Sequence, residues 1–171
     1  YECPPNPTGT IVLSPGKVGE PYAEHLPPLT CGERESFFVP SPPEGLIFSE
    51  SGAISGKPLQ GGTQEFLVIY ESNDGCVVIG TARIDVCPVI TLSDLPPMVQ
   101  GAGYDQTIAV SGIIPPYDVA DSGLPAGIVR DGLRIHGTPS SPGPYTFTIT
   151  VTHPATSCVK SRTYSLTCPK G

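Results

Sequence analysis

Six cysteines are the residues of this chain best suited to covalent or metal chemistry, and their spacing favours one kind. They form no C-x-x-C pair and lie beside no pair of histidines, so the pattern favours disulfides over a zinc site. Stable disulfides require an oxidising compartment, which predicts an extracellular or cell-surface location. The six are Cys3, Cys31, Cys76, Cys87, Cys158 and Cys168.

Groups for catalysis do not converge in the sequence. The three histidines, His25, His136 and His153, occupy non-equivalent places, and each is interpreted as a surface or structural residue. The chain contains no nucleophile elbow and no phosphate-binding glycine loop. The sequence therefore predicts a protein that is not an enzyme and needs no cofactor.

Calcium is the one metal ion that the acidic residues of the sequence could bind. Glu71, Asn73 and Asp74 form the only local cluster, and they precede Gly75 between two apolar runs. The equivalent place in the second half of the chain holds Thr152, Pro154 and Ala155. A tight hairpin turn explains Asn73-Asp74-Gly75 better than a metal site.

The aromatic residues predict a core and not a sugar-binding platform. Five of them stand at alternating positions of apolar runs and are expected to be mostly buried: Phe37, Phe66, Tyr70, Tyr145 and Phe147. The other tyrosines considered, Tyr1, Tyr104, Tyr117 and Tyr164, are scattered, and the chain has no Trp.

Charge excludes one class of partner. The formal net charge is −7, and residues 1–87 carry 4 basic and 11 acidic side chains against 5 and 5 in residues 88–171. No basic stripe is present to neutralise phosphates, so nucleic acid is not expected as a partner. No run approaches the ~20 apolar residues of a membrane span, and no signal peptide opens the chain, as expected of a mature protein or an excised fragment.

An internal repeat decides how the elements that carry these residues are organised. Gly45, Ile54, Gly56, Pro58 and Phe66 recur 81–82 residues later as Gly127, Ile135, Gly137, Pro139 and Phe147, and VGEPY (18–22) recurs as QGAGY (100–104). We expect two small domains, residues 1–87 and 88–171. No segment has helical periodicity, and 22 Pro and 20 Gly punctuate short apolar runs, which predicts an all-β fold.

About seven short strands are expected in each copy. Tyr145–Val151 alternates apolar residues with threonines, the pattern of a half-buried antiparallel strand. In the first copy we expect strands at 10–13, 22–26, 36–39, 46–48, 53–55, 64–71 and 76–87. In the second copy we expect them at 89–92, 105–111, 117–120, 128–129, 133–136, 145–152 and 158–168.

Residues 124–149 read LPAGIVRDGLRIHGTPSSPGPYTFTI, and this motif resembles the immunoglobulin-like, cadherin-like repeats of bacterial cell-surface proteins. The match runs from Gly101 to Cys168 in the second copy and from Val18 to Cys87 in the first, where Lys57 replaces the threonine of the motif. The resemblance implies two tandem immunoglobulin-like antiparallel β-sandwich domains. Members of the family serve as spacers, stalks and adhesive arrays, so the motif is specific for fold and not for function.

The sandwich fold implies which cysteines meet. Cys76 and Cys87 bracket one strand and stand ~35 Å apart, too far for a bond that spans ~5.5 Å. Because the first strand of such a sandwich runs parallel to the last, Cys87 is expected to bond to Cys158 and Cys3 to Cys76, although Cys31 is expected at that same pole. Cys168 is left for an intermolecular disulfide, or is orphaned by the boundary of a fragment.

The sequence thus predicts a non-catalytic structural or adhesive repeat of an extracellular stalk, adhesin or filament. Its expected partners are copies of itself or neighbouring repeats, docked head to tail. The alternative is a carbohydrate-recognition or accessory module of a larger secreted protein, which would bind surface glycans through an exposed aromatic patch.

Overall fold

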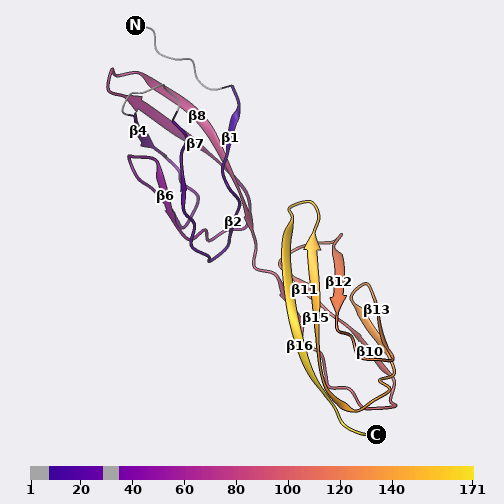
Figure 1. Ribbon diagram of the computed structural model, residues 1–171. Helices are drawn as coiled ribbons and strands as arrows, with labels where there is room; N and C mark the ends of the chain where they lie inside the picture. The colour runs from indigo at the N-terminus through magenta and orange to yellow at the C-terminus, as the bar shows by residue number, and fades with distance from the viewer. Residues whose placement is uncertain (1–7, 29–34) are drawn as a thin grey trace. The chain divides into compact units, whose positions relative to one another are not determined.

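The computed structural model describes residues 8–28 and 35–171, which form two compact units, Tyr1–Val89 and Ile90–Gly171 (Figure 1). Every element in the described residues is a β-strand. The predicted all-β class is confirmed. No helix in this part of the chain is long and apolar enough to cross a membrane.

The first unit consists of two sheets. One sheet has the order β1-β8-β7-β4, with β2 also paired to β8, and the other has the order β3-β6-β5. The strands are β1 (Thr10–Val12), β2 (Gly16–Lys17), β3 (Glu24–His25), β4 (Glu35–Phe38), β5 (Leu46–Phe48), β6 (Ala53–Gly56), β7 (Gly62–Ser72) and β8 (Val77–Cys87).

The core of the first unit lies between its two sheets. Alternate residues of β7, namely Phe66, Val68 and Tyr70, are buried, as period-two patterning requires. Leu46 and Ile54 of the second sheet belong to the same buried cluster. This cluster contains only residues of the first unit, so the unit has a hydrophobic core of its own.

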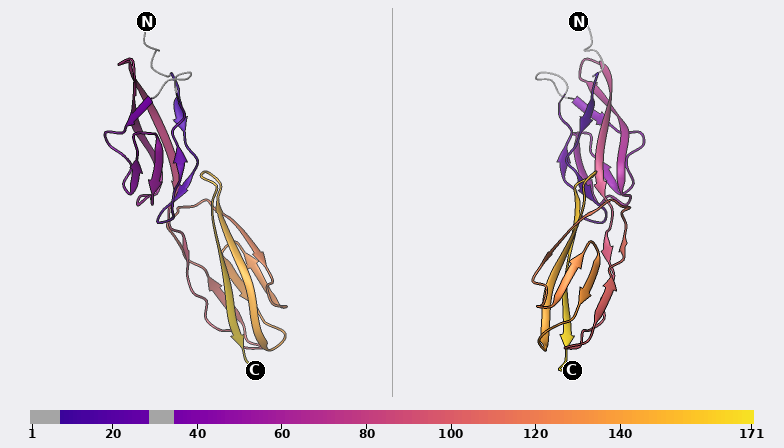
Figure 2. Two further views of the ribbon diagram at one scale, coloured as in Figure 1. Left: turned by 60° about the vertical axis from the view of Figure 1, so that its left-hand side comes forward. Right: turned by 90° about the vertical axis from the view of Figure 1, so that its right-hand side faces the viewer.

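The second unit repeats this plan. The hairpin of β15 (Gly143–His153) and β16 (Cys158–Cys168) carries β12 (Asp118–Ser122) beside β15 (Figures 1 and 2). A second sheet has the order β10-β14-β13, from β10 (Tyr104–Thr107), β14 (Arg134–Gly137) and β13 (Ile128–Asp131). A short pair joins β9 (Thr91–Leu92) and β11 (Val110–Ser111).

The hairpin of the second unit divides apolar from polar residues as the sequence predicted. Phe147, Ile149 and Val151 of β15 are buried. The opposite face carries hydroxyl groups in cross-strand pairs: Thr148 Oγ1 lies 3.0 Å from Thr163 Oγ1, and Thr150 Oγ1 lies 2.8 Å from Ser161 Oγ. These pairs satisfy side-chain polar groups on a face that points to solvent.

The repeated glycines form a close backbone contact in each unit. Thr138 N donates to Gly127 O at 2.9 Å, and a Cβ on Gly137 would lie 2.1 Å from that same oxygen. Lys57 N likewise donates to Gly45 O at 3.0 Å, and a Cβ on Gly56 would lie 2.2 Å from Gly45 O. The repeat therefore preserves glycine because two chain segments touch there.

Apart from shifts of strand ends, such as Glu24–His25 in place of 22–26, the structure differs from the sequence-based strands in two elements. The strand expected over 105–111 is broken into β10 and β11, because β10 pairs with β14 whereas β11 pairs with β9. Ile108, at the break, turns its side chain into the core and donates its N–H to Leu133 O at 2.9 Å. Strand β2 was not expected, since two residues carry no periodic signal.

Candidate functional site

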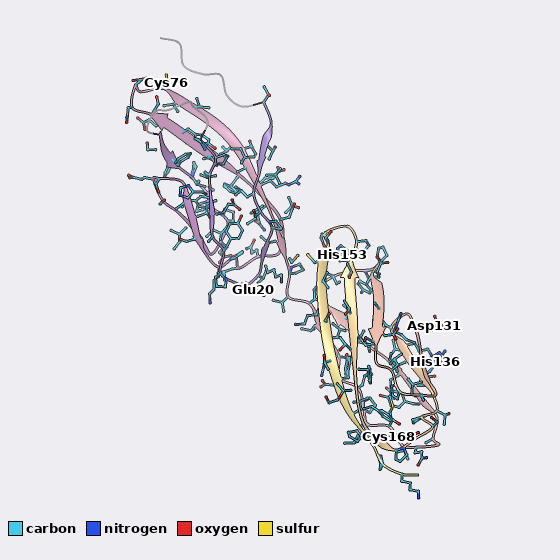
Figure 3. The ribbon with its side chains drawn as sticks, in the orientation of Figure 1. Glu20, Cys76, Asp131, His136, His153 and Cys168 are labelled. Carbon is cyan, nitrogen blue, oxygen red and sulfur yellow. The ribbon has the colours of Figure 1, made fainter. Side chains whose placement is uncertain are left out.

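Cysteine chemistry is present in both units. Cys76, Cys87 and Cys158 are disulfide-bonded, whereas Cys168 is a free thiol. Cys76 lies at the hairpin end of the first unit and Cys168 at the C-terminal end of the second (Figure 3). Cys3 and Cys31 lie outside the described residues. The pairs Cys87–Cys158 and Cys3–Cys76 stay predictions, which peptide mapping without reduction would test.

Cys168 is enclosed by its own unit. Its exposure is 3%, and its Sγ lies 3.6 Å from Ser141 O. A thiol in that position must be uncovered before it can attack another sulfur. The predicted intermolecular disulfide through Cys168, with Cys31 as a further candidate, therefore requires local opening of the C-terminal end.

The histidines and the acidic hairpin considered as functional candidates lie in strands and turns. His136 lies in β14, His25 ends β3, and His153 Nδ1 lies 2.7 Å from Thr156 Oγ1 in a hairpin turn. In the other hairpin, Gly75 has a φ of 79° and donates its N–H to Ser72 O at 3.0 Å. Within residues 8–28 and 35–171, no group of three His, Cys, Asp or Glu side chains could hold a metal ion.

Most of the aromatic residues expected in the core are buried there. Phe37 packs edge-on against Tyr70 with ring centroids 4.8 Å apart, and Phe147 stacks on Tyr164 at 5.4 Å. Tyr145 differs from expectation because it is only partly buried. Tyr104 and Tyr164, which the sequence left unassigned, are also buried.

In the first unit the opening segment of the fold is hydrogen-bonded to the last strand. Strands β1 and β2 pair with β8 in parallel, with Thr10 opposite Thr81 and Lys17 opposite Cys87. Between and after them, Leu13 N donates to Arg83 O and Val18 N to Cys87 O, both at 2.9 Å. The parallel arrangement of the first and last strands, predicted from the sandwich fold, is confirmed in this unit.

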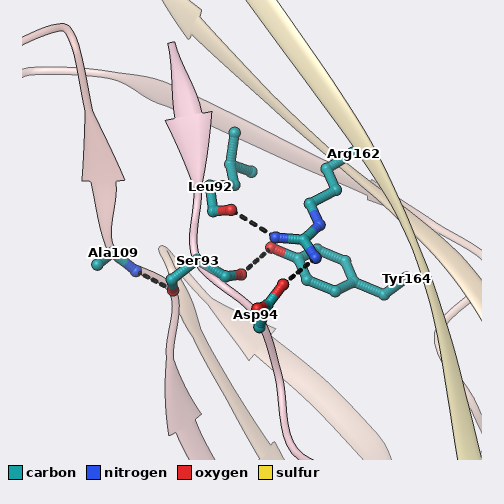
Figure 4. A network of polar contacts seen from close by, with 6 residues as sticks. All are labelled: Leu92, Ser93, Asp94, Ala109, Arg162 and Tyr164. Carbon is teal, nitrogen blue, oxygen red and sulfur yellow. Dashed lines mark hydrogen bonds and ion pairs between the residues drawn. The ribbon is translucent and has the colours of Figure 1, made fainter.

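The second unit fastens the same segment with side chains as well as backbone. Met98 N donates to Thr167 O at 3.0 Å and Gln100 N to Pro169 O at 3.1 Å. Upstream, Arg162 of β16 donates to Leu92 O at 2.6 Å and pairs with Asp94 (Figure 4). We call residues 92–94 with Arg162 and Tyr164 the terminal clamp.

Tyr164 completes the terminal clamp. Its hydroxyl donates to Ser93 O at 2.7 Å, and the Arg162 guanidinium carbon lies 4.7 Å from the centre of its ring. Ser93 Oγ in turn accepts from Ala109 N at 2.8 Å (Figure 4). Sequence reasoning missed the clamp, since Asp94 and Arg162 stand far apart in the chain and no motif links them.

A repeated tyrosine ties down the same segment in both units. Tyr22 donates its hydroxyl proton to Ser14 O and Tyr104 to Pro96 O, each at 2.8 Å across eight residues. Burial raises the pKa of Tyr22 to about 12, with the charge of Glu24 adding to the effect. Burial likewise raises the pKa of Tyr104 to about 12, with Tyr164 contributing.

These tyrosines predict a loss of stability in alkali. In the unfolded chain a tyrosine ionises near pH 10, whereas the folded units hold these protons to about pH 12. The free energy of unfolding is therefore highest below about pH 10 and falls as the pH rises toward 12, because in this range only the unfolded state loses the tyrosine protons. Urea unfolding at pH 8 to 12 should show this fall. Tyr104→Phe should make the fall shallower for the second unit alone, where burial also raises the pKa of Tyr164, and an unchanged slope would contradict the assignment.

Comparison with known proteins identifies the fold. Residues 88–169 match the family model described as "Putative Ig domain". The N-terminal eight Ig domains of Down Syndrome Cell Adhesion Molecule align with 94% of this chain and 23% of that structure, at 11% identity and a TM-score of 0.65. The insect immune protein hemolin aligns with 100% of this chain and 48% of its own, at 12% identity and a TM-score of 0.53.

Identity this low shows the fold alone, and the chain spans less than half the length of both structures. No curated protein matches the sequence. The alignments and the two sheets of each unit confirm that the chain contains two immunoglobulin-like β-sandwiches in tandem.

Proposed function

From the match of residues 88–169 to the family model described as "Putative Ig domain", we propose that the chain is a non-catalytic structural repeat of an extracellular stalk, adhesin or filament. The disulfide-bonded Cys76, Cys87 and Cys158 support an oxidising location. The proposal assigns the chain a mechanical task, namely to keep each module folded when its ends are pulled.

One observation carries the mechanical part of the proposal. In the first unit, β1 and β2 run parallel to β8, and in the second unit residues 98–100 are bonded along the end of β16. Tension on the two ends of such a module slides the first segment along the last strand. All the bonds between them then bear load together, instead of opening one after another. Resistance to forced unfolding depends on the rate of unfolding, so bonds at this position count most.

The terminal clamp offers a direct test. Arg162→Gln removes the hydrogen bond to Leu92 O and the ion pair with Asp94. We expect a lower peak force for unfolding the second unit in single-molecule pulling experiments, with the first unit unchanged. Arg130→Gln is the matched control, because Arg130 pairs with Asp121 at 2.6 Å but fastens neither the first segment nor the last strand. Equal loss of force in both variants would refute the proposal.

We further propose that chains join end to end, with the end of the chain that carries Cys168 meeting, in a neighbour, the end that carries Cys76, where the sequence also predicts Cys3 and Cys31. If the joint is covalent, denaturing electrophoresis without reductant should show a ladder that collapses on reduction. Cys168→Ser should shorten the ladder and leave each chain folded. A ladder unchanged by Cys168→Ser would rule out the covalent joint.

A further inference from the structure

The two units hold their first strand in different places. In the first unit Thr10–Val12 forms β1, which runs parallel to β8. The equivalent residues of the second unit are 92–94, because the hydroxyl of the repeated tyrosine bonds Ser14 O shortly after β1 and Pro96 O shortly after residues 92–94. These residues begin in β9, which pairs with β11 and not with β16. The same segment of one module thus has two observed positions.

In the second unit one edge of β16 is left open. Thr167 O accepts a hydrogen bond from the first segment at this edge. Thr163 and Ser165 face the same edge, because backbone groups alternate along an antiparallel strand. No backbone group of the second unit, all of which the structure describes, bonds them there. We call the backbone N–H and C=O groups of Thr163 and Ser165 the open edge.

Two inward-facing positions of the last strand differ between the units. Opposite the repeated phenylalanine, β8 carries Ala82 and β16 carries Tyr164. Two residues earlier, β8 carries Gly80 and β16 carries Arg162. Small residues at these positions leave room for β1 to lie against β8, with Ile11 packed on the core cluster. The second unit has an aromatic ring and a guanidinium group in the same two places.

The two large side chains reach across to the first segment of the second unit (Figure 4). Leu92 O accepts from Arg162 at 2.6 Å, and Ser93 O accepts from the Tyr164 hydroxyl at 2.7 Å. A strand paired directly with β16 would lie only about 4.8 Å from it. The inward side chain of such a strand, Ile11 in the first unit, would need the space that the ring and the guanidinium group occupy. The open edge therefore stays without a strand.

One residue of the segment itself is suited to the position on β11. Ser93 N donates to Ala109 O at 2.9 Å, and Ser93 Oγ accepts from Ala109 N at 2.8 Å. Its counterpart Ile11 has no hydroxyl group and packs against the core cluster instead. An exchange of the two arrangements must therefore change Ser93 together with the two residues of β16.

We propose that the size of Arg162 and Tyr164 keeps the first strand of the second unit on β11, and that small residues in their places let residues 92–94 pair in parallel with the open edge. The first unit supports this second position, because it holds the same segment there beside two small residues. The chain keeps the segment within reach, since Met98 N bonds the end of β16 at 3.0 Å. Arg162 and Tyr164 are thus positioning residues for a strand with two places.

Hydrogen exchange at single amides, measured by NMR on the whole chain, distinguishes the two positions. In the first unit Leu13 N donates to Arg83 O at 2.9 Å. The equivalent groups of the second unit, Leu95 N and Ser165 O, are not bonded to each other in the parent chain. Their bond should form only when the strand lies on β16. Slow exchange at the Leu95 amide therefore reports the transfer.

The forward variant Ser93→Ile, Arg162→Gly, Tyr164→Ala gives the second unit the residues of the first. We expect its Leu95 amide to exchange at least about tenfold more slowly than in the parent chain. A substitution that only destabilised the unit would make exchange faster, so slower exchange is specific to the transfer. The Gln100 amide, which is bonded in the parent chain, checks that the unit of the variant is folded.

Arg162→Gln combined with Tyr164→Phe is the matched control. It removes both side-chain hydrogen bonds to residues 92–94 and keeps most of the volume of the two side chains. The Leu95 amide of the control should exchange no more slowly than in the parent chain. Slow exchange in the control as well would overturn the proposal that side-chain size decides the position.

The reverse exchange is made in the first unit, so that the proposal does not depend on the folding of one variant. Ile11→Ser, Gly80→Arg, Ala82→Tyr should release β1 from β8. The Leu13 amide should then exchange at least about tenfold faster, whereas the Val18 amide, which bonds the end of β8, should keep its rate.

Either exchange can overturn the proposal. It fails if the Leu95 amide of a folded forward variant exchanges as in the parent chain, and it fails equally if the Leu13 amide keeps its parent rate in a folded reverse variant. Neither experiment applies force or uses Cys168, so its result is independent of the mechanical and end-to-end proposals.

Discussion

Adding one methyl group at Gly127 is expected to unfold the second unit and leave the first unit folded. A Cβ at Gly127 would lie 1.9 Å from Thr138 O, and the φ of Gly127 is 89°. Relief of that overlap must separate two backbone segments that Thr138 N and Gly127 O hold together. Strain at such a φ costs about 1–3 kcal/mol before the overlap is counted, out of a total stability of about 5–15 kcal/mol.

In calorimetry, the Gly127→Ala variant should therefore show no thermal unfolding transition for the second unit, whereas the transition of the first unit should remain. Gly137→Val, whose Cβ would lie 2.1 Å from Gly127 O, should act in the same way. Gly132→Ala is the control, because its φ is 59° and nothing lies within 4 Å of the added Cβ. It should cost only about 1–2 kcal/mol. Equal losses at Gly127 and Gly132 would show that the backbone contact is unimportant.

Truncating one buried aromatic residue should destabilise one unit at a time. Phe147 is fully buried and stacks on Tyr164, and its counterpart Phe66 packs edge-on against Phe48 at 5.2 Å. Each Phe→Ala change should cost about 3–5 kcal/mol through lost burial and the cavity left behind. Because the core cluster of the first unit contains no residue of the second, the two losses should be independent.

Urea unfolding followed separately for each unit would measure this independence. Phe147→Ala should lower the midpoint of the second unit only, and Phe66→Ala that of the first only. A shift of both midpoints by either substitution would mean that the two units unfold as one.

The sequence predicted most strands because alternation records burial directly. Tyr145–Val151 alternates without a break, and the structure places it in β15 with Phe147 and Val151 buried. Alternation cannot report where a strand changes partner. The segment 105–111 was for that reason expected as one strand, although Ile108 leaves one pairing for the core and β11 takes up another.

Strand β7 of the first unit left a signal in the sequence that alternation does not explain. Residues 66–70 read FLVIY, apolar on both faces, where the second copy reads FTITV. An unbroken run is usual in a strand buried on both sides, but here one face meets solvent. The terminal clamp left no such signal, because its residues come together only when the ends of the module do.

The parallel course of the first segment and the last strand also bears on how such chains grow. In the first unit β1 runs alongside β8 from Thr81 onward in the same direction, and the polypeptide leaves the unit from the end of that strand at Cys87. A gene that duplicates this module can add a copy after the last residue without disturbing any bond inside the earlier one. A module whose ends met at the same pole would crowd its neighbour with every duplication. The number of modules can thus change without a change in the fold of each one, and the length of one such step is the 81–82-residue offset of the repeat.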